Sequence, residues 1–206
     1  AHAISSELAA GSSDIALNPR TGDFYATARF DGRVRSLRPV IGVDGNVAAV
    51  YGTGAIALPN PLGTYDSRGI VFDAAGDNAY VVSRTPNTLW VIDTGPNDRQ
   101  NGTGVRNQLV SQIDMLSAPE ALMLVDEADG TYLYIAELGE GEILVLDPVT
   151  GAAVDRFDLG RSPAEMAVDQ VRHQRMYVTL FRENAVAVVD LDPTSRRYRT
   201  TVAKIR

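Results

Sequence analysis

The sequence predicts an all-β chain made of repeated, four-stranded antiparallel sheets, and three observations lead to this prediction. A tyrosine stands 13 residues before the end of an apolar run four times, at Tyr25, Tyr80, Tyr134 and Tyr177. These tyrosines recur after 55, 54 and 43 residues. Each copy joins two β-rich runs through a polar turn that contains Gly or Asn. Repeat periods of this size with all-β content are typical of the blades of a β-propeller.

Each copy divides into four short runs that we expect to be strands. The last copy reads most clearly, with runs at 164–169, 176–181, 185–190 and 198–205. The third run of a copy is apolar at nearly every position, which predicts a strand covered on both faces. The fourth run alternates polar and apolar residues, as expected at a wetter outer rim. The predicted blades lie near 12–53, 67–113, 118–159 and 162–205.

The repeat also predicts which side chains are buried. The recurring tyrosine and a valine of the third run occupy the same place in successive copies, which core or interblade packing produces. We therefore expect six of them to be largely buried: Tyr80, Val91, Tyr134, Val145, Tyr177 and Val188. Two longer connections, 54–67 and 94–106, interrupt the repeat. Such connections either carry recognition or are solvated loops without a partner.

The first residues suggest that the four copies are part of something larger. Residues 1–11 resemble residues 152–160, the outer run that leads into the last copy. We therefore expect 1–11 to be the outer strand of a preceding blade. A surplus outer strand favours a ring of six to eight blades, and a closed four-bladed ring is the alternative.

Composition excludes several classes of function. No apolar run of the 206-residue chain approaches the length of a membrane-spanning helix, so no membrane span is expected. The net charge is −7 with both signs interspersed, which argues against a nucleic-acid partner. The absence of cysteine excludes disulfides, thiolate metal sites and a cysteine nucleophile within these residues.

The last copy carries a resemblance to a known family. Its residues are Tyr177-Val178-Thr179, then Asn184 to Asp190, and before them Ser162 to Asp169. This pattern resembles the YVTN-type β-propeller repeat of YncE-like and surface-layer proteins of bacteria and archaea, over residues 12–205. The resemblance implies the propeller fold and an extracytoplasmic, bacterial location. The fourth motif position, usually Asn, is Ala28, Ser83, Glu137 and Leu180 here, so the role of that side chain does not carry over.

Charged residues gather where a propeller exposes its axial face. There the starts of the first strands, the loops between blades and the turns between the second and third strands meet. The candidate ligand-binding residues are Asp14, Arg68, Glu120, Glu137 and Glu165, and further charges at the turns are Arg29, Arg84 and Arg182. These groups would bind a small polar ligand or a cation, with solvated rim charges as the alternative. Carboxylates near a propeller axis can hold Ca²⁺, but no ligand spacing supports a metal, and no cofactor is expected.

Catalytic constellations are missing from the sequence. His2 is terminal and His173 lies in a turn that we expect to face away from the axial face, so a histidine-based triad or a haem site lacks support here. The first hypothesis is therefore a non-enzymatic extracytoplasmic binding or scaffold module, whose partner is another protein or the remaining blades of the same propeller. The alternative is a propeller enzyme of the lactonase, lyase, quinoprotein or haem-associated oxidoreductase type, with its catalytic groups outside this segment.

Overall fold

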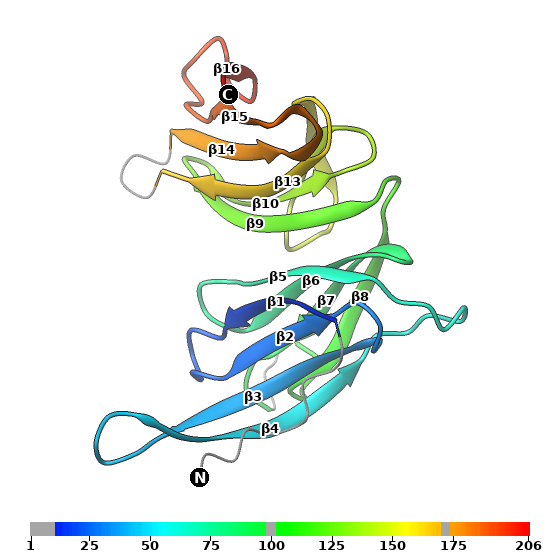
Figure 1. Cartoon of the computed structure of the whole chain (residues 1–206), viewed down its shortest axis with the longest axis vertical. Coiled ribbons are helices and arrows are strands. Elements are labelled where there is room, and N and C mark those ends of the chain that lie inside the picture. Colours follow the sequence, from blue (N-terminus) through cyan, green and yellow to red (C-terminus); the bar gives the residue numbers. More distant parts are fainter. Residues whose placement is uncertain (1–10, 98–101, 170–173) are drawn as a thin grey trace. The chain divides into compact units, whose positions relative to one another are not determined.

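The computed structural model describes residues 11–97, 102–169 and 174–206. Its described strands form four antiparallel sheets of four strands, each in sequence order (Figure 1). The chain divides into two compact units, the first ending at Asp114 and the second beginning at Met115. The prediction of an all-β chain of four-stranded blades is confirmed.

The first unit contains two sheets. Sheet 1 consists of β1 (Ser12–Leu17), β2 (Phe24–Ala28), β3 (Arg33–Ile41) and β4 (Val47–Ala57). Sheet 2 consists of β5 (Ser67–Phe72), β6 (Asn78–Arg84), β7 (Asn87–Asp93) and β8 (Gln108–Asp114). Strand β4 runs four residues into the stretch 54–67 that the sequence assigns to a connection. It does so because it pairs with the long β3 as far as Arg33, opposite Ala57.

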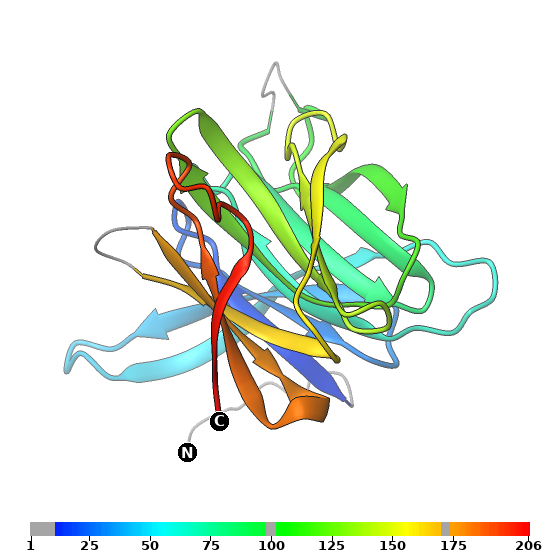
Figure 2. The ribbon, with the colours of Figure 1, turned by 90° about the horizontal axis from the view of Figure 1, so that it is seen from above.

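The second unit contains the other two sheets. Sheet 3 consists of β9 (Pro119–Glu127), β10 (Gly130–Glu137), β11 (Glu142–Leu146) and β12 (Ala153–Asp158). Sheet 4 consists of β13 (Pro163–Val168), β14 (Arg175–Leu180), β15 (Ala185–Asp190) and β16 (Thr201–Ile205). A single 3₁₀ turn, η1 (Phe181–Glu183), joins β14 to β15. Strand β16 pairs with β15 at the edge of its sheet (Figure 2).

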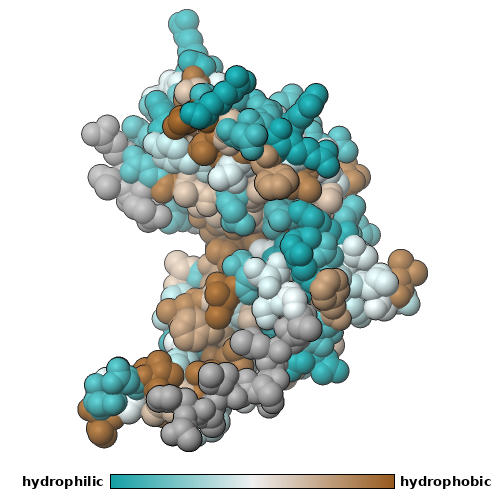
Figure 3. Space-filling model, viewed as in Figure 1, coloured by the Kyte–Doolittle hydropathy of each residue, from teal (hydrophilic) through white to brown (hydrophobic). Residues whose placement is uncertain are grey.

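Each unit has an apolar core between its two sheets. In the first unit, Tyr25 and Val34 of sheet 1 pack with Val81, Trp90 and Ile92 of sheet 2. In the second, a matching set joins sheets 3 and 4: Tyr134, Ala136, Ile143, Val145, Met176, Val178, Ala187 and Val189. β-Branched and aromatic residues favour strands because they pack well on a pleated surface. The hairpin between β3 and β4 is different, since Ile41 and Val43 at its tip are exposed. Apolar surface is visible at the lower left of Figure 3, where this hairpin lies.

Five of the six side chains expected to be buried are buried, and Tyr177 is the exception. Its side chain is 40% exposed, whereas Tyr134 is 0% exposed. Met176 and Val178, on either side of it in β14, point into the core shared with sheet 3. Because neighbouring strand residues point to opposite faces, Tyr177 lies on the outer face of sheet 4. Within its unit, no described segment covers that face.

Three sequence predictions concern residues that lie mostly outside the described ranges. The predicted outer strand 1–11 lies, apart from Gly11, outside the described residues, as do His2 and His173. In the described part of the chain, no helix is long and apolar enough to cross a membrane.

Candidate functional site

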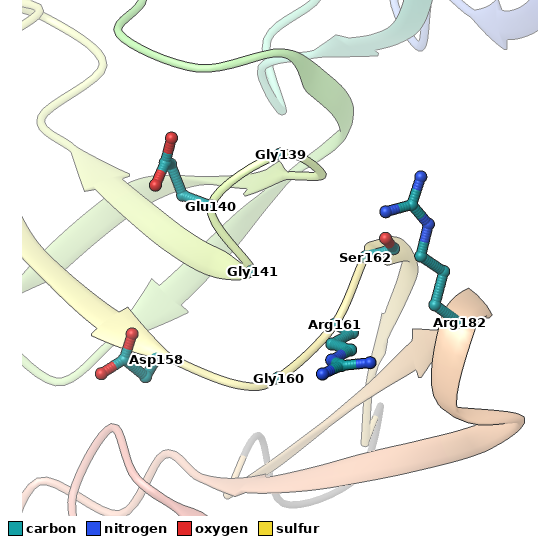
Figure 4. Close-up of a pocket in the computed structure, with 8 residues that line it drawn as sticks. All are labelled: Gly139, Glu140, Gly141, Asp158, Gly160, Arg161, Ser162 and Arg182. Carbon is teal, nitrogen blue, oxygen red and sulfur yellow. The ribbon is translucent and has the colours of Figure 1, made fainter.

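A hollow of about 530 Å³ lies in the second unit, where the loops of sheets 3 and 4 meet. The β10–β11 turn, the β12–β13 loop and the β14–β15 turn form its walls (Figure 4). These are the kinds of loop that the sequence analysis places on the axial face. The lining residues are Gly139, Glu140, Gly141, Asp158, Gly160, Arg161, Ser162 and Arg182.

Two glycines bring the walls of this hollow together. The carbonyl of Gly141 accepts hydrogen bonds from the N–H groups of Leu159 (3.0 Å) and Gly160 (3.2 Å). A Cβ atom on Gly141 would stand 2.4 Å from the carbonyl oxygen of Gly160, closer than any real contact. Gly141 also has φ of +82°, which other residues rarely adopt. The glycines therefore allow the two backbones to approach closely. The groups of this hollow that can bind a ligand are the charged side chains.

The charges of the hollow are separated by sheet. Arg182 comes from the β14–β15 turn of sheet 4 and Arg161 from the loop that leads into sheet 4, whereas Glu140 and Asp158 come from sheet 3 (Figure 4). All four side chains are exposed. Among the described residues, neither arginine guanidinium has an ion-pair partner. The hollow thus has a cationic side and an anionic side.

Glu183 fixes the β14–β15 turn beside the hollow. Its carboxylate accepts hydrogen bonds from Lys204 Nζ (2.8 Å) and from the backbone N–H of Arg161 (2.7 Å). These bonds lower the pKa of Glu183, the Lys204 bond most. Because Glu183 is engaged in this way, its charge compensates Lys204 and leaves the Arg161 guanidinium available.

Glu137 is buried at the end of β10, ahead of the β10–β11 turn. Its side chain is 0% exposed, and Arg156 donates to its Oε2 and to Oε2 of Glu142. Burial raises the pKa of Glu137, and the Arg156 guanidinium opposes that rise. The other carboxylate oxygen of Glu137 has no hydrogen-bond partner among the described residues. Glu137 thus lies under the rim of the hollow, which it does not line.

Asp14 and Arg68 come together in the first unit. Thr27 Oγ1 donates to the carbonyl of Arg68 (2.6 Å), and Asp14 Oδ2 accepts from the N–H of Ile70 (2.9 Å). The Arg68 guanidinium pairs with Asp66 (2.8 Å). The Asp14 carboxylate therefore bonds the backbone of the neighbouring sheet.

The other two predicted residues lie in the second unit and differ in their strand position. Relative to the recurring tyrosine, the pairing register places Glu165 at the position of Asp14 and places Glu120 at the position of Arg68. The four were predicted at equivalent strand starts, whereas the register puts them at two adjacent positions. Glu165 is exposed and Glu120 is half-buried.

The predicted residues thus form two local groups, each described within its own unit. Arg182 was expected at a turn of this face, but Arg161 was not singled out. The sequence feature that could have identified Arg161 as a site residue is its position in the loop between two blades, next to the Ser162-Pro163 pair of the repeat motif. Within the described ranges, no group of three or more His, Asp or Glu side chains could hold a metal ion.

Comparison with known proteins bears on the fold. No model of a known protein family matches the chain, and no curated protein matches it either. Among solved structures, the periplasmic gluconolactonase of Pseudomonas aeruginosa is similar over 94% of this chain, with a TM-score of 0.70 and 20% identity. The hydrazine synthase of Kuenenia stuttgartiensis is similar over 98%, with a TM-score of 0.68 and 15% identity. A protein of unknown function from Desulfotomaculum acetoxidans is similar over 96%, with a TM-score of 0.70 and 16% identity.

The four sheets are β-propeller blades. At these identities the likeness concerns the fold alone. The chain spans 53% of the gluconolactonase, 50% of the hydrazine synthase and 58% of the third protein. It therefore corresponds to about half the length of these structures. Sheets 1 to 4 are called blades 1 to 4 below.

Proposed function

We propose that this chain belongs to a bacterial, extracytoplasmic β-propeller that acts as a binding or scaffold module and takes a small polar ligand at the hollow of blades 3 and 4. One observation carries the proposal: Arg161 and Arg182 are exposed on the loops of the hollow, without an ion-pair partner among the described residues. Arginine is well suited to hold a carboxylate because its planar guanidinium can donate two parallel hydrogen bonds.

The opposite wall limits the class of ligand. Glu140 and Asp158 accept hydrogen bonds and repel a second negative charge. A ligand with one carboxylate and several hydroxyl groups, or with an ammonium group at its far end, satisfies both walls. A sugar acid and an amino acid have these features. In the second unit, Glu120 and Glu137 remain proposed members of this ligand-binding face, and Asp14 and Arg68 remain candidates within the first unit by itself.

The location and the role within a larger assembly rest on two supports. The motif around Tyr177 resembles a repeat of bacterial and archaeal surface proteins, and one structural neighbour is described as periplasmic. A second candidate function is a propeller enzyme whose catalytic groups lie outside residues 1–206. The likeness to a gluconolactonase favours a lactonase within that class.

Isothermal titration calorimetry tests the binding proposal. We expect gluconate to bind and the neutral sugar glucose not to bind, because only gluconate carries a carboxylate for the arginines. The double variant Arg161→Gln/Arg182→Gln should weaken gluconate binding at least tenfold, roughly the loss of one charged hydrogen bond. The control variant Arg33→Gln/Arg196→Gln removes two exposed arginines elsewhere and should bind gluconate normally.

Two outcomes count against the proposal. If neither gluconate nor any of a panel of amino acids and uronic acids binds, the proposed class of ligand is wrong. If the double variant binds gluconate as tightly as the wild type, the ligand does not bind at Arg161 and Arg182. Hydrolysis of gluconolactone above the uncatalysed rate would support the enzyme candidate instead.

A further inference from the structure

Blade 1 binds blade 2 through three polar side chains on one face. The Tyr25 hydroxyl donates to Asn107 Oδ1 (2.7 Å), and the Thr27 hydroxyl donates to the carbonyl of Arg68 (2.6 Å). Asp14 Oδ2 accepts from the N–H of Ile70 (2.9 Å). The Thr27 and Asp14 bonds thus bind a C=O and an N–H two residues apart on the inner strand of the next blade.

Blade 4 presents the same three positions on its outer face. The strand register aligns Tyr177 with Tyr25, Thr179 with Thr27 and Glu165 with Asp14. Blades 2 and 3 lack the polar pair, having Val82 with Gly69 and Ala136 with Ala121 at those two positions. A hydroxyl and a carboxylate are therefore not needed to form a blade, and they occur together in blades 1 and 4.

The local geometry of the pair is also the same in both blades. Thr27 Oγ1 accepts from the N–H of Asp14 (3.1 Å) and lies 3.4 Å from its carbonyl. Thr179 Oγ1 accepts from the N–H of Glu165 (2.9 Å) and lies 3.4 Å from its carbonyl. Thr27 has a second, shorter bond to the next blade. Among the described residues, Thr179 has no acceptor in a neighbouring blade. Its hydroxyl is held against Glu165 in the same way as the Thr27 hydroxyl is held against Asp14.

The tyrosine contact recurs as well. Asn107 precedes the outer strand of blade 2 with φ of +65°, and Arg199 holds the same place in blade 4 with φ of +55°. Tyr25 bonds Asn107, and Tyr134 of blade 3 accepts a hydrogen bond from Arg199 Nε (3.0 Å). In two blades the recurring tyrosine thus bonds the residue ahead of the outer strand of the next blade. The hydroxyl of Tyr177 has no hydrogen-bond partner among the described residues.

The surface around these side chains is apolar. Ile205 is 56% exposed and Phe181 is 76% exposed. They line a hollow of about 370 Å³ together with Thr179, Leu180, Ala185 and Val186. Exposed apolar patches next to ordered hydrogen-bonding groups are typical of an interface.

We infer that the outer face of blade 4 binds the inner strand of a further propeller blade of the same polypeptide. Thr179 donates to a backbone carbonyl of that strand, Glu165 accepts from the N–H two residues later, and Tyr177 bonds the residue ahead of its outer strand. A blade is favoured over other occupants because blade 4 has a tyrosine, a threonine and a carboxylate at the three positions with which blade 1 binds blade 2. The solved propellers of which this chain spans about half supply the second argument. This inference concerns assembly and is independent of the proposed ligand.

Tyrosine nitration with mass spectrometry tests the inference. The 206-residue chain is compared with the complete polypeptide that its gene encodes. We expect Tyr177 to be nitrated in the short chain and at least tenfold slower in the complete polypeptide. Tyr51, 59% exposed, should react in both proteins, and Tyr25, 0% exposed, should react in neither.

Paired variants add an energetic readout that keeps the native fold. Tyr177→Phe/Thr179→Val should lower the Tm of the complete polypeptide clearly more than that of the short chain, in which only the hydrogen bond between Thr179 and the N–H of Glu165 is lost. The matched variant Tyr25→Phe/Thr27→Val should lower the Tm of both. Equal nitration of Tyr177 in the two proteins, or a variant without effect on the complete polypeptide, would overturn the inference. A dimer of the short chain that protects Tyr177 would assign the face to a second copy and also overturn it.

Discussion

Arg199 forms a buried ion pair with Glu127, with Nη2 3.1 Å from the nearer carboxylate oxygen. The guanidinium also lies over the rings of Tyr132, Tyr134 and Tyr198, within 4.8–5.6 Å of their centroids. The hydroxyls of Tyr134 and Tyr198 donate to the same carboxylate. Burial and the Glu127 carboxylate raise the pKa of both tyrosines. This network joins the segment ahead of the outer strand of blade 4 to the first two strands of blade 3.

Replacing Arg199 by Met should destabilise the protein strongly. The change removes the cation and leaves the Glu127 carboxylate buried without a charge partner. Breaking a buried pair in this way costs about 3–5 kcal/mol of the free energy of unfolding. Urea unfolding measures it. Arg196→Met, at an exposed arginine three residues earlier, is the control and should stay within about 0.5 kcal/mol. A loss below 1 kcal/mol for Arg199→Met would show that the network does not hold in solution.

Truncating Ile143 tests the core between blades 3 and 4. The side chain is 0% exposed in a cluster with Tyr134 and Met176. Ile143→Ala should lower the free energy of unfolding by about 2–5 kcal/mol, because it leaves a cavity that the sheets cannot close. Val149→Ala, at a turn where the side chain is 91% exposed, should have almost no effect. Similar values for the two variants would mean that the strand register is wrong.

The fold could be predicted because a repeat shows its period even where single elements are degenerate. The exposure of Tyr177 could not be predicted, because it depends on what covers the face of a blade and not on the blade itself. The four predicted strand starts were aligned as equivalent for a related reason. The recurring tyrosine pairs with the residue nine before it in blades 1 and 2, eleven before it in blade 3 and ten before it in blade 4, and a pattern of apolar runs does not show these differences.

The hollow was predicted only in part. The geometry of the turns decides which exposed charged side chains lie close together. The sequence shows which residues are charged but not which of them are paired. Arg161 is available because Glu183 bonds its backbone N–H and the Lys204 ammonium. That arrangement depends on a 3₁₀ turn of three residues, η1, which no periodicity indicates.

Gly141→Ala should separate the effect of a steric clash from that of backbone strain. Gly141 has φ of +82° and Gly63 has φ of +65°, so alanine is strained at both. Alanine at Gly63 meets nothing within 4 Å, and it should cost about 1–2 kcal/mol. At Gly141 the added Cβ would clash with the carbonyl of Gly160, and the cost should be clearly larger. Thermal unfolding of the two variants gives the comparison. Equal losses would mean that the β10–β11 turn moves away from the β12–β13 loop at no cost.

The raised pKa of Glu137 should make stability fall as pH rises. The folded protein holds the Glu137 proton more tightly than the unfolded chain, whose carboxyl has a pKa near 4.5. The unfolded state therefore binds fewer protons from Glu137 above that pH, and the free energy of unfolding decreases as pH rises through the folded pKa. Glu137→Gln removes this dependence, and Arg156 keeps Glu142 as its partner at 2.9 Å. The wild type should thus lose stability relative to the variant as pH rises from about 4.5 through the raised folded pKa.

Glu183→Gln is the control of opposite sign for that experiment. Hydrogen bonds from Lys204 and the Arg161 N–H lower the pKa of Glu183 in the folded protein. Its contribution is complete above about pH 4.5 and is lost as pH falls through the folded pKa, because the unfolded state then binds more protons. Urea unfolding of both variants and the wild type between pH 3 and pH 8 gives the two slopes. Slopes of the same sign, or a Glu137→Gln difference that does not vary with pH, would contradict the burial of an ionisable carboxylate under the hollow.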